Sequence, residues 1–184
     1  MRLVSVNVGT PEEIGKFRGQ AILSAIVKKP VQGPVIVRRL NLEGDRQADL
    51  TVHGGVDKAV YVYPSEHYGY WKERYPGMDM PWGAFGENFT TEGLLEGDVH
   101  VGDRFIIGSA EFAATQPRVP CFKLGMKFET MTMIRSFLEA ERSGFYLSVL
   151  REGQVEAGDE IRVAKVNSNS ETMTSIFRAI TRGG

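Results

Sequence analysis

Short apolar runs, separated by glycine and proline positions, are the dominant pattern along this chain. The opening residues alternate between apolar and polar side chains, which is typical of a half-buried strand. Runs rich in β-branched and aromatic residues predict further strands at residues 21–28, 35–40, 59–63, 111–116, 145–150 and 160–166. Two similar stretches, each with a Gly-Asp pair between strand-like runs, predict hairpins around Gly102 and Gly158.

Helical spacing appears in fewer places. Pro64 ends a strand and can open a helix that runs to about Arg74. Apolar residues recur at helical intervals within 131–142 and within 171–180, which predicts two more helices. A short helical turn is expected after Pro120, whereas the glycines and prolines between residues 78 and 93 favour a long ordered loop.

The order of these elements indicates the fold class. Because short strands do not alternate regularly with long helices, a doubly wound parallel sheet is disfavoured. We expect a mainly β protein with helical insertions (α+β), built as a closed, mostly antiparallel β-barrel with a short C-terminal helix. The barrel domain is expected to span residues 1–166 and the short helical tail residues 167–184.

The net charge of −1 and the single cysteine narrow the classes of function. One thiol can form neither an intrachain disulfide nor a cysteine-rich structural zinc site. The near-neutral charge gives no reason to expect a nucleic acid or an anionic membrane as partner. No apolar run approaches the roughly 20 residues of a spanning helix, and the first residues lack the pattern of a signal peptide. We therefore expect a cytoplasmic protein without nucleic-acid or membrane partners.

A first candidate site is the polar, glycine-rich stretch at residues 42–61. It offers Arg46, His53 and Lys58 as cations. His53, Gly54 and Gly55 could turn successive backbone N–H groups inward and form an anion-binding nest. The alternative is an ordinary turn with a hydrogen-bonded histidine.

A second candidate is the run Gly83-Ala84-Phe85-Gly86-Glu87-Asn88. Its glycines could bring the backbone close to a ligand, and the Asn88 side chain offers both a donor and an acceptor. The alternative is a loop asparagine whose hydrogen bonds are satisfied within the protein.

A third candidate is Cys121, which follows two prolines and would lie near the start of a short helical turn. A thiol in that position, with Arg118 and Lys123 nearby, should have a lowered pKa. The thiolate is the form that ligates a metal or attacks an electrophile. The alternative is an inert, buried cysteine that packs as a small apolar residue.

Four short motifs occur in a specific order: Gly44-Asp45-Arg46-Gln47-Ala48-Asp49, His53-Gly54-Gly55, Gly86-Glu87-Asn88 and Gln116-Pro117-Arg118-Val119-Pro120-Cys121. Each is weak alone, but together they make residues 24–128 resemble the MOSC domain, the molybdenum cofactor sulfurase C-terminal domain, and most of all its YiiM-like branch. That branch usually continues into a longer helical C-terminal extension, whereas residues 167–184 leave room for one helix of about ten residues.

The resemblance implies a MOSC β-barrel that binds the molybdenum cofactor, a molybdopterin. It also implies reduction of N-hydroxylated compounds, such as hydroxylaminopurines and hydroxylamines, to amines. Cys121 would be the metal ligand and catalytic residue, and Phe85 and Tyr63 are candidates for stacking on the substrate. The residues expected to bind the cofactor are Lys28, Arg46, His53, Gly54, Gly55, Lys58, Asn88 and Arg118.

Two other functions remain open at this point. The domain could be a non-redox cofactor or sulfur-carrier module with Cys121 as persulfide carrier, or a hydrolase with a Cys121 nucleophile. For the reductase, the expected partners are a small N-hydroxylated substrate and a separate electron-donor protein, because no flavin or iron–sulfur motif is evident. A homodimer is also compatible with the sequence.

Overall fold

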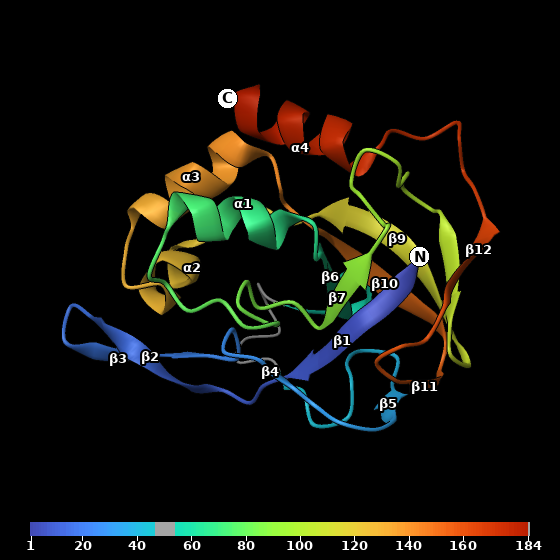
Figure 1. The fold of residues 1–184 in the computed structure, drawn as a ribbon, viewed down its shortest axis with the longest axis horizontal. Coiled ribbons are helices and arrows are strands. Elements are labelled where there is room, and N and C mark those ends of the chain that lie inside the picture. Colours follow the sequence, from blue (N-terminus) through green and yellow to red (C-terminus); the bar gives the residue numbers. More distant parts are fainter. Residues whose placement is uncertain (47–53, 184) are drawn as a thin grey trace.

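An eight-stranded sheet organises residues 1–46 and 54–183, which are the residues described by this computed structural model (Figure 1). The strands are β1 (Arg2–Val8), β2 (Glu12–Phe17), β3 (Gln20–Ser24), β4 (Lys29–Pro30), β5 (Val35–Val37), β6 (Val60–Pro64), β7 (Phe89–Glu92), β8 (Arg104–Ile107), β9 (Ala110–Pro117), β10 (Phe145–Arg151), β11 (Gly153–Val155) and β12 (Ile161–Lys165). The helices are α1 (His67–Arg74), α2 (Phe122–Lys127), α3 (Thr132–Ala140) and α4 (Met173–Arg182).

The large sheet has the order β12-β8-β9-β10-β6-β7-β1-β4, and β11–β5 and β2–β3 form two separate pairs. Neighbouring strands of the large sheet pair antiparallel except β6 and β7, which run parallel. The expected α+β class and mostly antiparallel pairing are therefore confirmed.

The closed barrel is wrong for the described residues, because no sheet among them closes on itself. One edge is β4, which has two residues, and its Pro30 has no N–H group to donate. The other edge is β12. The start of the chain meets residues 158–161 through one bridge, Arg2 to Glu160, and three backbone hydrogen bonds. The Leu3 N–H donates to the Asp159 carbonyl at 2.9 Å, the Gly158 N–H to the Leu3 carbonyl at 2.7 Å and the Ile161 N–H to the Met1 carbonyl at 3.0 Å. These contacts link β1, the strand beside the β4 edge, to the start of β12 without pairing the two strands as a ladder.

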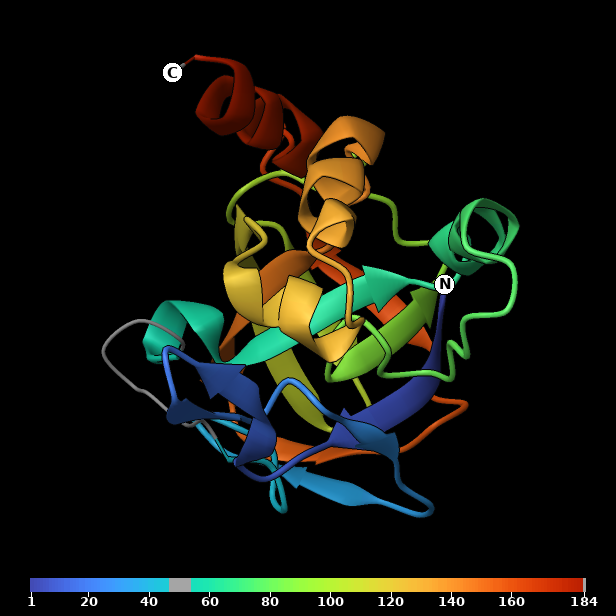
Figure 2. The ribbon, with the colours of Figure 1, turned by 90° about the vertical axis from the view of Figure 1, so that its left-hand side faces the viewer.

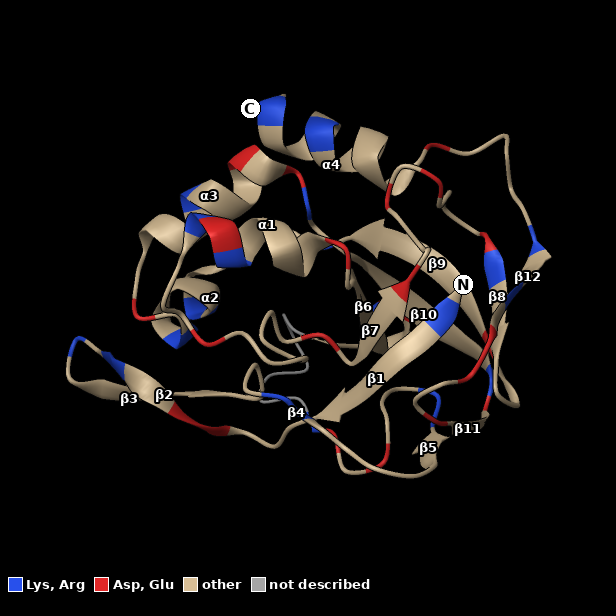
Figure 3. Ribbon diagram, viewed as in Figure 1, with Lys and Arg blue, Asp and Glu red and all other residues tan. Residues whose placement is uncertain are grey.

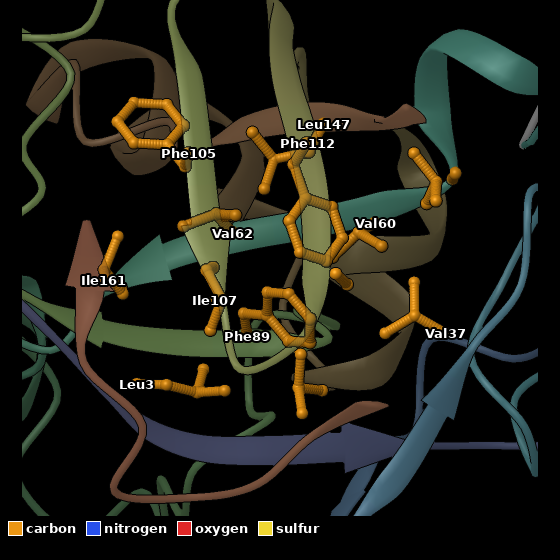
Figure 4. Packing of buried hydrophobic residues seen from close by; sticks show 14 of the residues in the cluster. Leu3, Val37, Val60, Val62, Phe89, Phe105, Ile107, Phe112, Leu147 and Ile161 are labelled. Atoms are coloured by element: carbon orange, nitrogen blue, oxygen red, sulfur yellow. The ribbon is translucent and has the colours of Figure 1, made fainter. Parts of the chain in front are cut away.

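The main core lies on one face of the large sheet, where alternate strand residues point inward (Figure 4). Phe89 and Phe112 meet edge to face, with ring centroids 5.6 Å apart. Leu3, Val62 and Ile107 are fully buried around them. Full burial of each such side chain stabilises the fold by about 1.5–3 kcal/mol, so this cluster holds the strands that carry the site residues.

A second, aromatic core lies between the sheet and the helices α1, α2 and α3. Trp71 stacks on Phe137 with centroids 5.8 Å apart, and its indole N–H donates to the Tyr63 hydroxyl at 2.6 Å. Phe85 stacks on Tyr63 at 4.6 Å. This layer fixes the helices against β6 and forms the back of the cavity described below.

The short C-terminal helix expected from the sequence is present as α4, which has 10 residues. Thr172 caps it by accepting a hydrogen bond from the Ser175 N–H at 3.2 Å, and Phe177 is fully buried. Arg178 and Arg182 both pair with Glu141, the residue after α3. The tail is therefore attached to the domain through both packing and charge.

Three strands, β2, β4 and β7, lie where the sequence did not predict them. β7 falls inside the expected loop at 78–93, and β2 has few apolar residues and a register shift between Glu13 and Lys16. The expected strand at 21–28 ends at Ser24, and the one at 35–40 ends at Val37. β2 and β3 form a hairpin that projects from the large sheet (Figure 1).

Candidate functional site

A cavity opens where the ends of β3, β6 and β10 meet the chain that leaves β9. Figure 2 faces this side, on which α2, the β2–β3 hairpin and the helical turn Val56–Lys58 come together. The residues lining it are Ser24, Ala25, Ile26, Lys28, Asp45, Arg46, Gly54, Lys58, Tyr61, Phe85, Gly86, Asn88, Arg118, Val119, Cys121, Lys123 and Tyr146. Seven of the nine site residues expected from the sequence are among them.

Cys121 is placed by the end of β9 and the start of α2. Pro117 ends the strand, and Cys121 is the residue that precedes the first turn of α2, with extended backbone. Its carbonyl accepts a hydrogen bond from the Leu124 N–H at 3.0 Å. The thiol is half-buried and not disulfide-bonded, and it lines the cavity. The helical turn expected after Pro120 is confirmed.

Arg118 is a buried cation in the same wall. Its guanidinium carbon lies 5.0 Å from the ring centroid of Tyr61 and 5.2 Å from that of Phe137. Burial disfavours its charge, but the neighbouring Tyr61, Tyr146 and Cys121 groups outweigh this, and the pKa of Arg118 lies above its usual value. The Nη1 atom has no hydrogen-bond partner among the described residues. A buried donor without a partner is costly, so this atom is a candidate contact for an anionic ligand.

Lys28 is held by a protein carboxylate. Its ammonium group forms an ion pair with Asp45, and the two side chains are 8% and 2% exposed. Burial lowers the pKa of Lys28, although the Asp45 charge opposes this. Asp45 also accepts the Gly9 N–H at 2.8 Å. Lys28 therefore lines the cavity as part of an ion pair rather than as a lone cation.

Asn88 uses both ends of its amide within the protein. Its oxygen accepts the Tyr61 N–H at 3.1 Å, and its nitrogen donates to Asp45 Oδ2 at 2.9 Å and to the Asn7 carbonyl at 3.3 Å. It thus ties β6 to the Lys28–Asp45 pair, and this network orders one wall of the cavity.

Glu87, the preceding residue, is turned away from these partners. Its fully buried carboxylate accepts the Gly83 N–H at 2.8 Å and the Phe85 N–H at 3.1 Å, and burial raises its pKa. The glycines here approach protein backbone: a Cβ at Gly83 would lie 2.8 Å from the Lys28 carbonyl oxygen. The Gly-Glu-Asn motif therefore shapes the loop that carries Phe85 and Asn88.

The glycine-rich stretch is only partly described. His53 lies outside the described residues, so its expected role stays a prediction. Gly54 lines the cavity with φ of 148°, and Gly55 precedes the turn Val56–Lys58 with φ of 89° but does not line it. Both φ values favour glycine.

Positive charge gathers around the opening of the cavity. Arg46, Lys58 and Lys123 line it, in addition to Arg118. The Lys58 ammonium group lies 6.0 Å from the ring centroid of Tyr146. Figure 3 shows basic positions on α2 and at the tip of the β2–β3 hairpin. The site therefore offers one thiol surrounded by cations, which suits an anionic ligand.

Sequence reasoning missed three residues of this region. Tyr61 and Tyr146 line the cavity, and Lys127 at the end of α2 donates to the Ile26 carbonyl at 3.1 Å and the Gly83 carbonyl at 2.9 Å. Burial lowers the pKa of Lys127 to about 8. Tyr63, expected near the substrate, lies instead in the aromatic core. Whether these side chains face the cavity or the core depends on the strand order, and the spacing of the residues in the sequence does not show the strand order.

The comparison with family models matches the MOSC domain at residues 49–162, which is more than half of the chain. The chain therefore belongs to the MOSC domain family.

Individual relatives place it near YiiM. The chain is 42% identical over 161 residues to the uncharacterized protein YflK of Bacillus subtilis, covering 88% of this chain and 72% of YflK. The crystal structure of YiiM from Geobacillus stearothermophilus superposes with a TM-score of 0.81 at 35% identity, covering 99% of this chain and 84% of that one. The chain is thus a YiiM-like MOSC protein. A protein of Gibberella moniliformis named "Reductase" is 34% identical over 146 residues, but these span 78% of this chain and 26% of that protein.

In the described part of the chain, no helix is both long enough and apolar enough to cross a membrane.

Proposed function

We propose that this protein is a molybdenum cofactor-dependent reductase that converts N-hydroxylated compounds of the hydroxylaminopurine or hydroxylamine type to amines. The observation that carries the proposal is the pairing of two groups in one cavity. Cys121 is the single thiol of the chain, and Arg118 is a buried cation whose Nη1 atom has no partner among the described residues.

The residues fit a cofactor that joins a soft metal to an anionic pterin. A thiolate is a soft ligand, and Cys121 would supply it. Arg118 is positioned to bind phosphate or a pterin oxygen through its unused N–H groups. Arg46, Lys58 and Lys123 would add positive charge at the opening. Asn88 and the Lys28–Asp45 pair would keep their part of the cavity wall in place.

The overall reaction is R–NHOH + 2 electrons + 2 protons → R–NH2 + H2O, in which the N–O bond breaks and nitrogen is reduced. The molybdenum cofactor, when bound, supplies this two-electron chemistry. Tyr146, which is half-buried and packs against Tyr61 with ring centroids 5.3 Å apart, would offer aromatic surface in this cavity to a planar substrate. The electrons would come from a separate electron-donor protein, because a chain with one cysteine cannot hold a four-cysteine iron–sulfur cluster.

The comparisons support an enzyme of the MOSC family, and the reduction and its substrate are the proposal's own. The family is named for molybdenum cofactor sulfurase, and one relative is named as a reductase. A cytoplasmic location, a homodimer, and the lack of nucleic-acid and membrane partners remain predictions.

The test is turnover of 6-hydroxylaminopurine by protein made in a host that synthesises the molybdenum cofactor, with reduced methyl viologen as electron source. We expect adenine as product with wild-type protein and none with Cys121→Ser. A matched control, Val119→Ser, changes a neighbouring cavity residue and should retain activity. A persulfide on Cys121 in inactive, metal-free wild-type protein would favour the sulfur-carrier alternative. Metal-independent ester or amide hydrolysis would favour the hydrolase.

A further inference from the structure

A charged cluster that takes no part in lining the cavity joins α1, the loop after β7 and the connector from α3 to β10, which comprises residues 141–144. His67 at the start of α1 is 5% exposed, and Glu96, in the loop after β7, is 3% exposed. The His67 Nε2 atom lies 2.8 Å from Glu96 Oε2, and its Nδ1 atom lies 2.9 Å from Nη1 of Arg142, in the connector from α3 to β10. The guanidinium of Arg142 also lies 4.7 Å from the ring centroid of Tyr70.

The chemistry of these groups fixes the protonation state of His67. A guanidinium can only donate, so the Nδ1 atom of His67 must accept the hydrogen bond from Arg142. The Nε2 atom then carries the proton and donates it to Glu96. In this arrangement His67 is neutral and joins a buried carboxylate to a cation.

Glu96 bonds to the part of the connector that follows Arg142. Its Oε1 atom accepts the Gly144 N–H at 2.6 Å. Gly144 in turn accepts the Arg118 N–H at 3.2 Å through its carbonyl. The preceding residue, Ser143, accepts the Tyr61 hydroxyl at 2.7 Å. Glu96 is therefore two hydrogen bonds away from the backbone of Arg118.

The connector has little freedom to adjust. Gly144 has φ of 61°, and a Cβ there would lie 2.3 Å from the Val62 carbonyl oxygen. Gly144 lies so close to β6 that a displacement of the connector would also move the groups hydrogen-bonded to the connector. Those groups belong to Tyr61 and Arg118. In the cavity wall the guanidinium carbon of Arg118 lies 5.0 Å from the ring centroid of Tyr61.

We infer that the cluster of His67, Glu96 and Arg142 is a positioning device that fixes Arg118 and Tyr61 for ligand binding, with neutral His67 as its central member. None of the three touches the cavity, so they are positioning residues rather than catalytic ones. The inference rests on the proposed function only for the idea that Arg118 binds an anion.

The first measurement needs no ligand. Nitrogen-15 NMR of metal-free protein should show His67 protonated on Nε2 and unprotonated on Nδ1 at pH 7.5. The Arg118 side-chain N–H resonances should be shifted upfield by the Tyr61 and Phe137 rings. An Nδ1–H tautomer, or a doubly protonated ring, would overturn the inference.

The second measurement uses inorganic phosphate as probe for Arg118 in the same metal-free protein. His67→Leu removes both hydrogen bonds and should weaken phosphate binding about tenfold while shifting the Arg118 resonances. His67→Gln retains one donor and one acceptor and should restore binding to within about threefold. Arg142→Met provides a second disruptive variant if His67→Leu fails to fold, because Arg142 is only half-buried.

A matched control separates positioning from general destabilisation. Glu141→Gln removes the ion pairs with Arg178 and Arg182 at the first residue of the connector, and the Glu141 side chain has no hydrogen bond or ion pair with any member of the cluster. It should leave phosphate affinity and the Arg118 resonances unchanged. Wild-type affinity and resonances in a folded His67→Leu or Arg142→Met protein would overturn the inference. Failure of wild-type protein to bind phosphate would count against the anion role of Arg118 in the proposed function, while the resonances would still decide on positioning.

Discussion

Lys28 and Asp45 form an ion pair that is almost fully shielded from solvent, with side chains 8% and 2% exposed. The sequence predicted Lys28 as a cofactor contact. The structure shows that its charge is matched within the protein, and that the Asn88 amide donates to the other oxygen of the same carboxylate. We conclude that this pair builds the cavity wall, whereas Arg118 offers the unused donor.

Breaking this buried ion pair should lower the free energy of unfolding more than breaking an exposed ion pair. Asp45→Asn leaves the buried Lys28 ammonium without its counter-charge and should lower the free energy of unfolding by about 3–5 kcal/mol at pH 7. Glu92→Gln, which breaks the exposed Arg2–Glu92 pair, should cost less than ~1 kcal/mol. Urea unfolding of both variants checks this, and equal costs would contradict the assigned burial.

Lys127 should make stability depend on pH. Its pKa is about 8 in the folded protein, because burial disfavours the charge, and about 10.4 when unfolded. Between these values the unfolded chain binds more protons, so the stability of wild-type protein should rise with pH. Below pH 8 this contribution should be constant.

The measurement is the difference in unfolding free energy between wild type and Lys127→Met from pH 7 to 9.5. The difference removes the contributions of other groups, including the buried tyrosines. We expect it to move in favour of wild type above pH 8. A difference that does not change with pH would contradict the lowered pKa.

Gly144 should tolerate no side chain. A Cβ would lie 2.3 Å from the Val62 carbonyl oxygen, and its φ of 61° is unfavourable for alanine. Gly144→Ala should therefore lower the free energy of unfolding by more than about 3 kcal/mol. Gly158→Ala is the control, because its φ of 101° with nothing within 4 Å adds backbone strain and no clash, and it should cost about 1–2 kcal/mol. Thermal or urea unfolding of the two variants would show similar losses if the close approach at Gly144 were unimportant.

The fold was predictable where the apolar pattern is regular. The strands around β6, β9 and β10 follow from runs of β-branched and aromatic residues, and α4 follows from its apolar face. β2 was missed because Glu12, Glu13 and Gly15 give no alternation. The parallel pairing of β6 with β7 and the open edges at β4 and β12 depend on contacts between distant segments, which spacing alone does not determine.

The residues of the site were predictable where the groups that share the cavity are close together in the sequence. Arg118 and Cys121 are neighbours in sequence on either side of Pro120, so their shared cavity follows from local geometry. The pairing of Lys28 with Asp45 spans 17 residues, and the reach of Lys127 to Ile26 spans 101. These partners are fixed by the fold, which explains why the sequence indicated Lys28 without its partner and missed Lys127.

The molybdenum content of purified protein tests the central claim most directly. Protein from a host that makes the cofactor should contain about one molybdenum per chain by mass spectrometry, since Cys121 provides one thiolate. Cys121→Ser should lose the metal, whereas Val119→Ser, in the same cavity, should retain it. Full molybdenum occupancy in folded Cys121→Ser, or none in the wild-type protein, would contradict the account.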